Sequence, residues 1–369
     1  MIIKIKPIDL NSLEMDEKII SSIDNILKSF GEKKHIILAE KAFFSFIIDR
    51  ADLFGVNSRR YANAALNQQR ELNALTKIVN FYVEVDFSLN KFNNFDISND
   101  DRNILTISAD YFSDTKLIQS ASIICEDIND IDLYELFSNY FVEQARLNHL
   151  STSFNKVNGG GANTSKVFDK TSDDGVIGLC IVDSDKSHPL GARGSTSKKL
   201  GTTKYKNRCR LVIINAHEAE SLIPVHIIDE IIHRDTYENH VIDSFDTMKN
   251  IFSASLNTKL YFDHKEGFKL KDAITLDSSY GPFWVPALKS TKKFDHLRCV
   301  NERACGEDCS CVSFYGLGDT LLEKSLVILK KNKMSSVATK TSESLVMEWL
   351  SLGKLFFSWF CAPPTKVRQ

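Results

Sequence analysis

Short apolar runs alternate with amphipathic segments through the middle of the chain. Four runs, at 121–125, 152–157, 176–182 and 209–214, have the length and composition of strands. Residues 130–148, which lie between the first two runs, repeat apolar side chains at helical spacing. Strands that alternate with helices are typical of an α/β fold with a parallel sheet. We therefore predict a Rossmann-like parallel sheet flanked by helices.

The pattern predicts a further region on each side of this core, which we place at 116–226. Residues 1–115 carry apolar side chains at helical spacing over 16–30 and 61–85. The stretch 90–103 is dense in Asn and Asp and is expected to be a loop. We interpret this first region as an accessory, mostly helical N-terminal part.

Residues 227–369 are predicted to form a helical C-terminal region. Its strongest apolar pattern lies at 341–360, and Pro363 and Pro364 end that helix. The apolar surface of the helix is broad, so we expect it to dock on the core or on a partner chain.

Acidic side chains follow three of the four expected core strands. Glu126 follows the first strand, Asp183 and Asp185 follow the third, and Glu218 and Glu220 follow the fourth. Because ligands bind outside the carboxyl ends of parallel strands, we expect these acids to converge there. Carboxylates held close together repel one another unless a cation lies between them, and oxygen ligands suit Mg²⁺ or Mn²⁺.

Local structure offers an alternative explanation for each acidic motif. Asp and Asn beside Glu126 could form a helix N-cap, and Asp183-Ser-Asp185 could be a surface turn. Either Glu218 or Glu220 could serve only as a cap of the next helix. The glycines at 159–161 could bring the backbone close to a phosphate, or they could form a tight turn.

A basic segment follows the third core strand. Residues 186–210 contain eight Lys or Arg residues and no acidic residue, in a chain whose net charge is −2. Such cations neutralise phosphates and give affinity that does not depend on base sequence, whereas the alternative is a solvated loop. The residues that we expect to contact nucleic acid are Lys186, Arg193, Lys198, Lys199, Lys204 and Lys206.

Four of the eight cysteines lie within thirteen residues, at Cys299, Cys305, Cys309 and Cys311. Four thiolates at this spacing could hold one tetrahedral Zn²⁺, and His296 could replace one of them. A site in which every ligand is a thiolate would be closed, so we expect a structural zinc that holds a polar loop together.

Composition limits the remaining classes of function. The small net charge excludes a basic coat over the whole surface, so contact with nucleic acid requires a local patch. No apolar run approaches the roughly 20 residues of a membrane span, and the first residues lack the apolar core of a secretory signal. The distribution of cysteines fits a reducing compartment. We therefore expect a cytoplasmic protein that has no membrane partner.

Taken together, these motifs resemble those of the TOPRIM superfamily, the catalytic domain of topoisomerases, bacterial primases and overcoming-lysogenization-defect nucleases. Glu126 and Asp130 match its strand that ends in Glu with an Asp four residues on, and Asp183 and Asp185 match its Asp-x-Asp. The resemblance covers residues 119–224.

The resemblance extends to the end of that core and departs from the superfamily at one position. Residues 217–224 are similar to the acidic motif that closes the domain in TOPRIM-like nucleases of phage-defence systems, where Glu220 is the matching acid. Asp127 stands where the superfamily often has Gly.

The resemblance implies a Mg²⁺- or Mn²⁺-dependent endonuclease that hydrolyses phosphodiester bonds of DNA or RNA, as in antiviral defence. Glu126, Asp183 and Asp185 would hold one or two metal ions, and a second ion could recruit Asp130 and Glu220. No helicase or ATPase motif is present, so an ATPase partner would be another chain, and a homo-oligomer is possible. No obvious active-site tyrosine is present, which favours hydrolysis over topoisomerase-type transfer.

Two other functions stay open at this stage. One is a catalytically inactive protein that keeps the fold and binds nucleic acid or a protein partner. The other is a primase-like nucleotidyl transferase assisted by the zinc-binding element.

Overall fold

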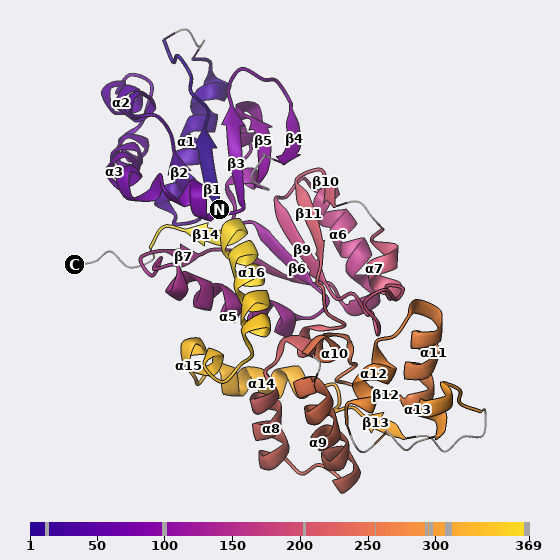
Figure 1. Ribbon diagram of the computed structural model, residues 1–369. Coiled ribbons are helices and arrows are strands. Elements are labelled where there is room, and N and C mark those ends of the chain that lie inside the picture. Colours follow the sequence, from indigo (N-terminus) through magenta and orange to yellow (C-terminus); the bar gives the residue numbers. More distant parts are fainter. Residues whose placement is uncertain are drawn as a thin grey trace.

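The N-terminal part of the chain is an α/β unit built on a five-stranded sheet (Figure 1). The computed structural model describes residues 1–11, 15–97, 102–201, 204–254, 256–291, 294, 298–306 and 312–364. The sheet has the order β2-β1-β3-β5-β4, and only β4 is antiparallel to its neighbour. Its strands are β1 (Ile2–Ile5), β2 (Ile36–Leu38), β3 (Phe81–Asp86), β4 (Asn93–Ile97) and β5 (Asn103–Ser108). Its helices are α1 (Glu17–Gly31), α2 (Lys41–Asp49), α3 (Val56–Leu72) and α4 (Leu75–Ile78), followed by the 3₁₀ turns η1 (Ala109–Ser113) and η2 (Thr115–Ile118).

The prediction of a mostly helical N-terminal region is therefore wrong. β1 and β2 are short, mainly apolar runs of four and three residues, and such runs carry no period that separates a strand from a helix. The helical pattern expected over 61–85 ends at Leu72, and its last residues form β3. The expected loop at 90–103 contains β4, whose Asn and Asp side chains are compatible with an edge strand.

The second sheet is the predicted core, and it has the order β10-β11-β9-β6-β8. All of its neighbours pair in parallel except the β10–β11 hairpin. Every residue of β6 and β9 is buried, which explains their uninterrupted apolar sequence. The strands are β6 (Ser122–Cys125), β8 (Asn155–Asn158), β9 (Gly178–Val182), β10 (Tyr205–Lys206) and β11 (Cys209–Ile213). The helices between them are α5 (Ile128–Gln144), α6 (Thr164–Asp173) and α7 (Ser195–Lys199), with the 3₁₀ turn η3 (Gly161–Asn163) before α6.

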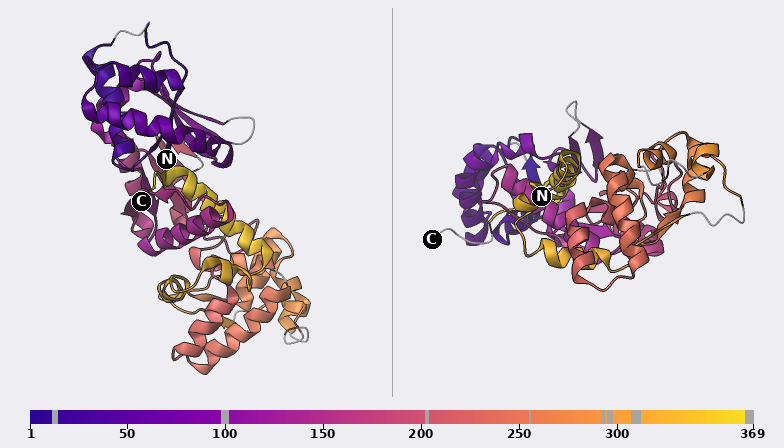
Figure 2. Two further views of the ribbon diagram at one scale, coloured as in Figure 1. Left: turned by 90° about the vertical axis from the view of Figure 1, so that its left-hand side faces the viewer. Right: turned by 60° about the horizontal axis from the view of Figure 1, so that its bottom comes forward.

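The chain then forms a lobe of helices at the opposite end of the molecule from the N-terminal unit (Figure 2). A small antiparallel sheet, β12–β13, lies within this lobe. The elements are the turn η4 (Ala219–Leu222), α8 (Val225–Arg234), α9 (Asn239–Ala254), α10 (Leu256–Tyr261), β12 (Gly267–Lys269), α11 (Leu270–Tyr280), α12 (Trp284–Lys289), α13 (Arg298–Glu302) and β13 (Ser313–Tyr315). No helix in the described ranges is long and apolar enough to cross a membrane.

The last helix returns from this lobe to the two sheets (Figure 1). After α14 (Leu321–Leu329) and α15 (Met334–Ala338), α16 (Glu343–Phe360) packs along α5, and β14 (Cys361–Ala362) pairs with β7 (Ser151–Thr152). These contacts confirm that the C-terminal helix docks on the core.

Two tryptophans of α16 hold the helix in place. The Trp359 ring stacks on Phe81 of β3 with 3.7 Å between centroids, and the Trp349 ring stacks on Phe137 of α5 at 5.3 Å. The Trp349 indole also donates a hydrogen bond of 2.9 Å to the Leu222 carbonyl at the end of η4. α16 therefore links the N-terminal sheet to α5 and η4.

Trp349→Ala should lower the free energy of unfolding by about 3–5 kcal/mol, because it removes a fully buried ring and leaves the Leu222 carbonyl without its donor. Met347→Ala, on an exposed side chain of the same helix, should change it by less than about 0.5 kcal/mol. Urea unfolding measures both. Equal effects of the two substitutions would contradict the proposed role of α16.

Candidate metal centre

A pocket of about 390 Å³ lies where the carboxyl ends of β6, β9 and β11 meet. Eight carboxylates and a single cation line it among the described residues. The acids are Glu126, Asp127, Asp130, Asp183, Asp185, Glu218, Glu220 and Asp319, and the cation is Lys265. The structure therefore brings together all five predicted catalytic acids.

Glu126 is the first side chain after β6, and it reaches toward the end of β9. Its carboxylate accepts a hydrogen bond of 3.3 Å from the Asp183 backbone N–H and another from the Thr196 hydroxyl on α7. Burial and the nearby Asp185 carboxylate raise the pKa of Glu126 in spite of these donors. Adjacent strands thus present their acids to the same space.

Asp183 is the most crowded acid of the pocket. It directly follows β9 and is buried. Burial, together with the carboxylates of Asp130, Glu126 and Glu220, raises the pKa of Asp183 well above its usual range. Without a bound cation, ionisation of all these groups together is therefore unfavourable.

Asp185 enters the pocket through a turn of the backbone. Asp183 and Asp185 were predicted to converge at the carboxyl end of their strand. β9 ends at Val182, and Asp185 has a φ of 51°, in the left-handed region. Its N–H donates to the His217 carbonyl at 2.9 Å. A Cβ at Gly194 would lie 1.9 Å from the Asp185 carboxylate, so this close approach requires glycine.

The acids at the start of α5 combine capping with a place in the pocket. Asp127 is the N-cap and accepts from the Asn129 N–H at 2.8 Å, while Asp130 accepts from the Asp127 N–H at 2.9 Å. Capping and pocket lining are therefore both properties of this motif. Burial raises the pKa of Asp130 to about 7, although the Asp127 N–H bond opposes the shift.

Lys265 compensates the two acids that follow β11. Its ammonium lies 3.3 Å from Glu218 and 3.2 Å from Glu220, and both carboxylates are buried. Burial lowers the pKa of Lys265, but Glu220, Glu218 and Asp183 outweigh it and raise the pKa overall. Oε2 of Glu220 is buried and has no hydrogen-bond partner in the described structure. That oxygen is available to a ligand in the pocket.

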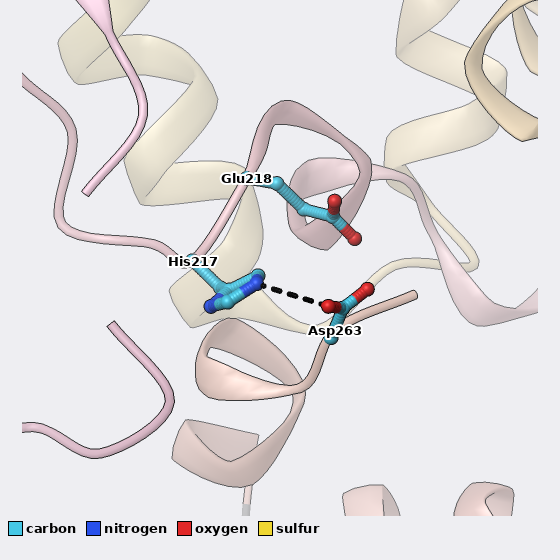
Figure 3. Close-up of side chains that lie close together, drawn as sticks. All are labelled: His217, Glu218 and Asp263. Atoms are coloured by element: carbon cyan, nitrogen blue, oxygen red, sulfur yellow. Dashed lines mark ion pairs between the residues drawn. The ribbon is translucent and has the colours of Figure 1, made fainter. Parts of the chain in front are cut away.

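A second group with metal-ligand chemistry lies beside the pocket (Figure 3). Ligand atoms of His217, Glu218 and Asp263 lie within 4.8 Å of one another. His217 Nε2 is 3.5 Å from Asp263, which also accepts from two backbone N–H groups, and Glu218 accepts from the His264 N–H at 2.6 Å. The carboxylates of Glu218 and Asp263 therefore already have hydrogen-bond partners within the protein.

The sequence analysis did not assign Lys265, Asp263 or His217 to the site. His217 adjoins the motif that supplied Glu220, and the other two lie in the polar turn at 261–267. That turn carries two acids and two basic residues within seven positions, and this density of charge was the signal available in the sequence.

The glycine turn at 159–161 serves to close the pocket wall. The Gly159 N–H donates to the Cys125 carbonyl at 2.7 Å, and those of Gly160 and Gly161 donate to the Glu126 carbonyl at 3.1 and 3.2 Å. These three N–H groups hold the end of β6, and a phosphate would have to displace those bonds.

The predicted basic residues divide into paired and unpaired side chains. Lys206 is neutralised by Asp169 at 2.7 Å and Asp173 at 3.4 Å, both on α6. Lys186 donates to the Pro189 carbonyl at 3.1 Å. The exposed side chains are Arg193, Lys198, Lys199 and Lys204.

Arg210 on β11 adds a cation to this surface. It lines a hollow of about 400 Å³ together with Arg193 and Lys204. Burial lowers the pKa of Arg210, and its Nε and Nη1 atoms have no partner within the described ranges. The hollow is therefore an electropositive recess beside β11 of the core sheet.

The predicted zinc cluster is only half covered by the described residues. Cys309, Cys311 and His296 lie outside them. Cys299 is on α13, and burial together with the Cys299 thiol raises the pKa of Cys305. The two described thiols are thus neighbours, and the zinc site stays a prediction.

No family model, curated protein or solved structure matches this chain.

Stability without divalent ions should fall as the pH rises from about 4 to about 7. Asp130 has a folded pKa of about 7 and an ordinary value of 3.8, so the folded state keeps a proton that the unfolded state has lost. Asp130→Asn should flatten this dependence and stabilise the protein by about 1–3 kcal/mol at pH 7.5.

Urea unfolding in the presence of a chelator, at several pH values, measures this effect. Asp174→Asn, on an exposed side chain at the end of α6, should leave the dependence of the free energy of unfolding on pH unchanged. If the free energy of unfolding of Asp130→Asn depends on pH as that of the wild type does, the pKa of Asp130 is not raised in the folded protein.

Proposed function

We propose that this protein is a Mg²⁺- or Mn²⁺-dependent nuclease of TOPRIM-like type that hydrolyses phosphodiester bonds. The observation that carries the proposal is the convergence of Glu126, Asp183 and Asp185 from adjacent parallel strands in one open pocket. A strand that ends in Glu beside a strand that ends in Asp-x-Asp is the pattern on which the resemblance rests.

The donor set of the pocket fits a hard divalent cation. Its side-chain donors among Glu126, Asp183, Asp185, Asp130 and Glu220 are all carboxylate oxygens, which suit Mg²⁺ and Mn²⁺. A bound cation would relieve the repulsion that raises the pKa of these acids, and the free Glu220 oxygen offers it a ligand. We favour this pocket over the His217 group, whose carboxylates already have partners.

Such a metal would polarise a phosphodiester and lower the pKa of a water molecule. Glu126, Asp183 and Asp185 would hold one or two ions, with Asp130 and Glu220 completing a second site. Lys265 supplies a positive charge beside Glu218 and Glu220, where it opposes the rise in pKa that burial causes in both, and it could neutralise a phosphate oxygen.

The electropositive recess supports nucleic acid as the substrate. Arg210 lies on β11, the strand next to β9, while Arg193 precedes α7 and Lys204 precedes β10. No described acidic residue lines the hollow that these three cations share. Exposed Lys198 and Lys199 extend the positive charge at the end of α7. A polyanion on this face could pass from the recess to the acidic pocket.

Asp183→Asn and Asp185→Asn should each lower Mn²⁺-dependent cleavage of DNA or RNA by about 100-fold or more, because each removes a charge that the cation requires. Asp174→Asn should cleave as the wild type does. Cleavage at wild-type level in both site variants would contradict the assignment.

The same assay distinguishes a nuclease from a nucleic-acid-binding protein and from a nucleotidyl transferase. A binding protein would show salt-dependent affinity for nucleic acid without metal-dependent turnover. A nucleotidyl transferase would incorporate labelled nucleotides on a single-stranded template.

Arg193→Gln and Lys204→Gln should each weaken binding of nucleic acid and reduce the slope of log affinity against log salt by about 1. Lys206→Gln is the matched control, and it should have a smaller effect because two aspartates already neutralise that lysine. Fluorescence anisotropy with the chelated protein measures the slopes. An equal loss in all three variants would contradict the proposed path of the nucleic acid.

A further inference from the structure

A buried lysine without a carboxylate partner lies in the C-terminal lobe. Lys259 on α10 is only 1% exposed, and its ammonium donates a hydrogen bond to the Ser221 carbonyl. It forms no ion pair with any described residue, although the Glu218 charge acts on it. A buried charge is unfavourable unless an opposite charge compensates it. Burial lowers the pKa of Lys259 to about 7, which reflects this lack of compensation.

A cavity of about 200 Å³ adjoins Lys259. Four segments that are far apart in the sequence line it: the start of α8, the end of α9, α10 and the start of α16 (Figure 1). Its apolar lining includes Val225, Phe252 and Leu345. Its polar lining includes Lys259, His226, Lys340, Thr341 and Ser342.

Basic side chains and the start of α16 contribute to the polar lining of the cavity. Burial and the Lys340 charge lower the pKa of His226, against the opposing influence of Glu230. Ser342 is the N-cap of the eighteen-residue helix α16, and its side chain makes no capping hydrogen bond. The N–H groups of the first helical turn lack partners within the helix and favour a negative charge in front of them.

We propose that this cavity binds a small oxyanion, a free phosphate or a phosphate monoester, whose charge compensates Lys259. The cationic side chains, the hydroxyls and the start of α16 would surround the phosphate oxygens. Phe252 and Leu345 offer an apolar surface to the carbon part of a monoester. The volume suits a phosphate group and the adjoining part of a monoester, and it excludes a nucleic-acid strand.

The site is separate from the acidic pocket and does not depend on the proposed nuclease function. The two are nevertheless close in the chain, because Lys259 holds the carbonyl of Ser221, which directly follows Glu220 in η4. A bound oxyanion would therefore be connected to Glu220 through Lys259 and Ser221. This short connection makes the oxyanion a candidate effector of the metal centre.

Thermal unfolding of the full chain tests the proposal, with inorganic phosphate and adenosine monophosphate as probes and potassium chloride at equal ionic strength as the reference. Saturating phosphate should raise the wild-type midpoint by roughly 2–5 °C. Lys259→Met should abolish the shift, and Lys340→Gln should weaken the apparent affinity at least about threefold. Lys331→Gln, on an exposed lysine outside the cavity, should behave as the wild type does.

The probes also separate the two sources of the oxyanion. A larger shift with adenosine monophosphate would identify a monoester, and an equal shift would identify free phosphate. Lys259→Met should be at least as stable as the wild type without phosphate, because an apolar side chain replaces an unpaired charge.

Two results would overturn the proposal. One is that phosphate shifts the wild type no more than chloride does, and the other is that it shifts Lys259→Met equally. If Lys259→Met does not fold, the double variant His226→Gln/Lys340→Gln decides the matter, because an undiminished phosphate shift in that variant contradicts the site.

Discussion

Buried carboxylates repel one another at the carboxyl edge of the core sheet, and the surrounding elements hold them together against this repulsion. Parallel pairing of β6, β9 and β11 brings acids from three strand ends into one pocket, and only Lys265 offsets them among the described lining residues. The fold holds these groups together at a cost in stability, as the raised pKa values of Asp130 and Asp183 show. An arrangement that destabilises the free protein is explained if a cation occupies the pocket during function.

Rigid supports on both sides of the pocket make this crowding possible. Trp349 of α16 stacks on α5 and bonds the end of η4, so one helix positions the elements that carry Asp130 and Glu220. Gly194 admits the Asp185 carboxylate, and the glycine turn at 159–161 holds the end of β6. Packing far from the pocket therefore determines the distances between its charges, and loss of that packing would let the acids move apart.

The core strands and their acids could be predicted because both signals are local. An apolar run followed at once by Glu126 or Asp183 needs no knowledge of distant residues. The partner of Glu218 and Glu220 could not be predicted in this way, because Lys265 comes from a turn in another lobe. β1 and β2 were missed because such short buried runs have no period, and they are strands only through their long-range pairing.

Anomalous scattering from crystals soaked in Mn²⁺ would show whether the acidic pocket binds a divalent cation. We expect an anomalous peak between the carboxylates of Glu126, Asp183 and Asp185. A pocket without a peak, or a peak only at His217, Glu218 and Asp263, would contradict this expectation.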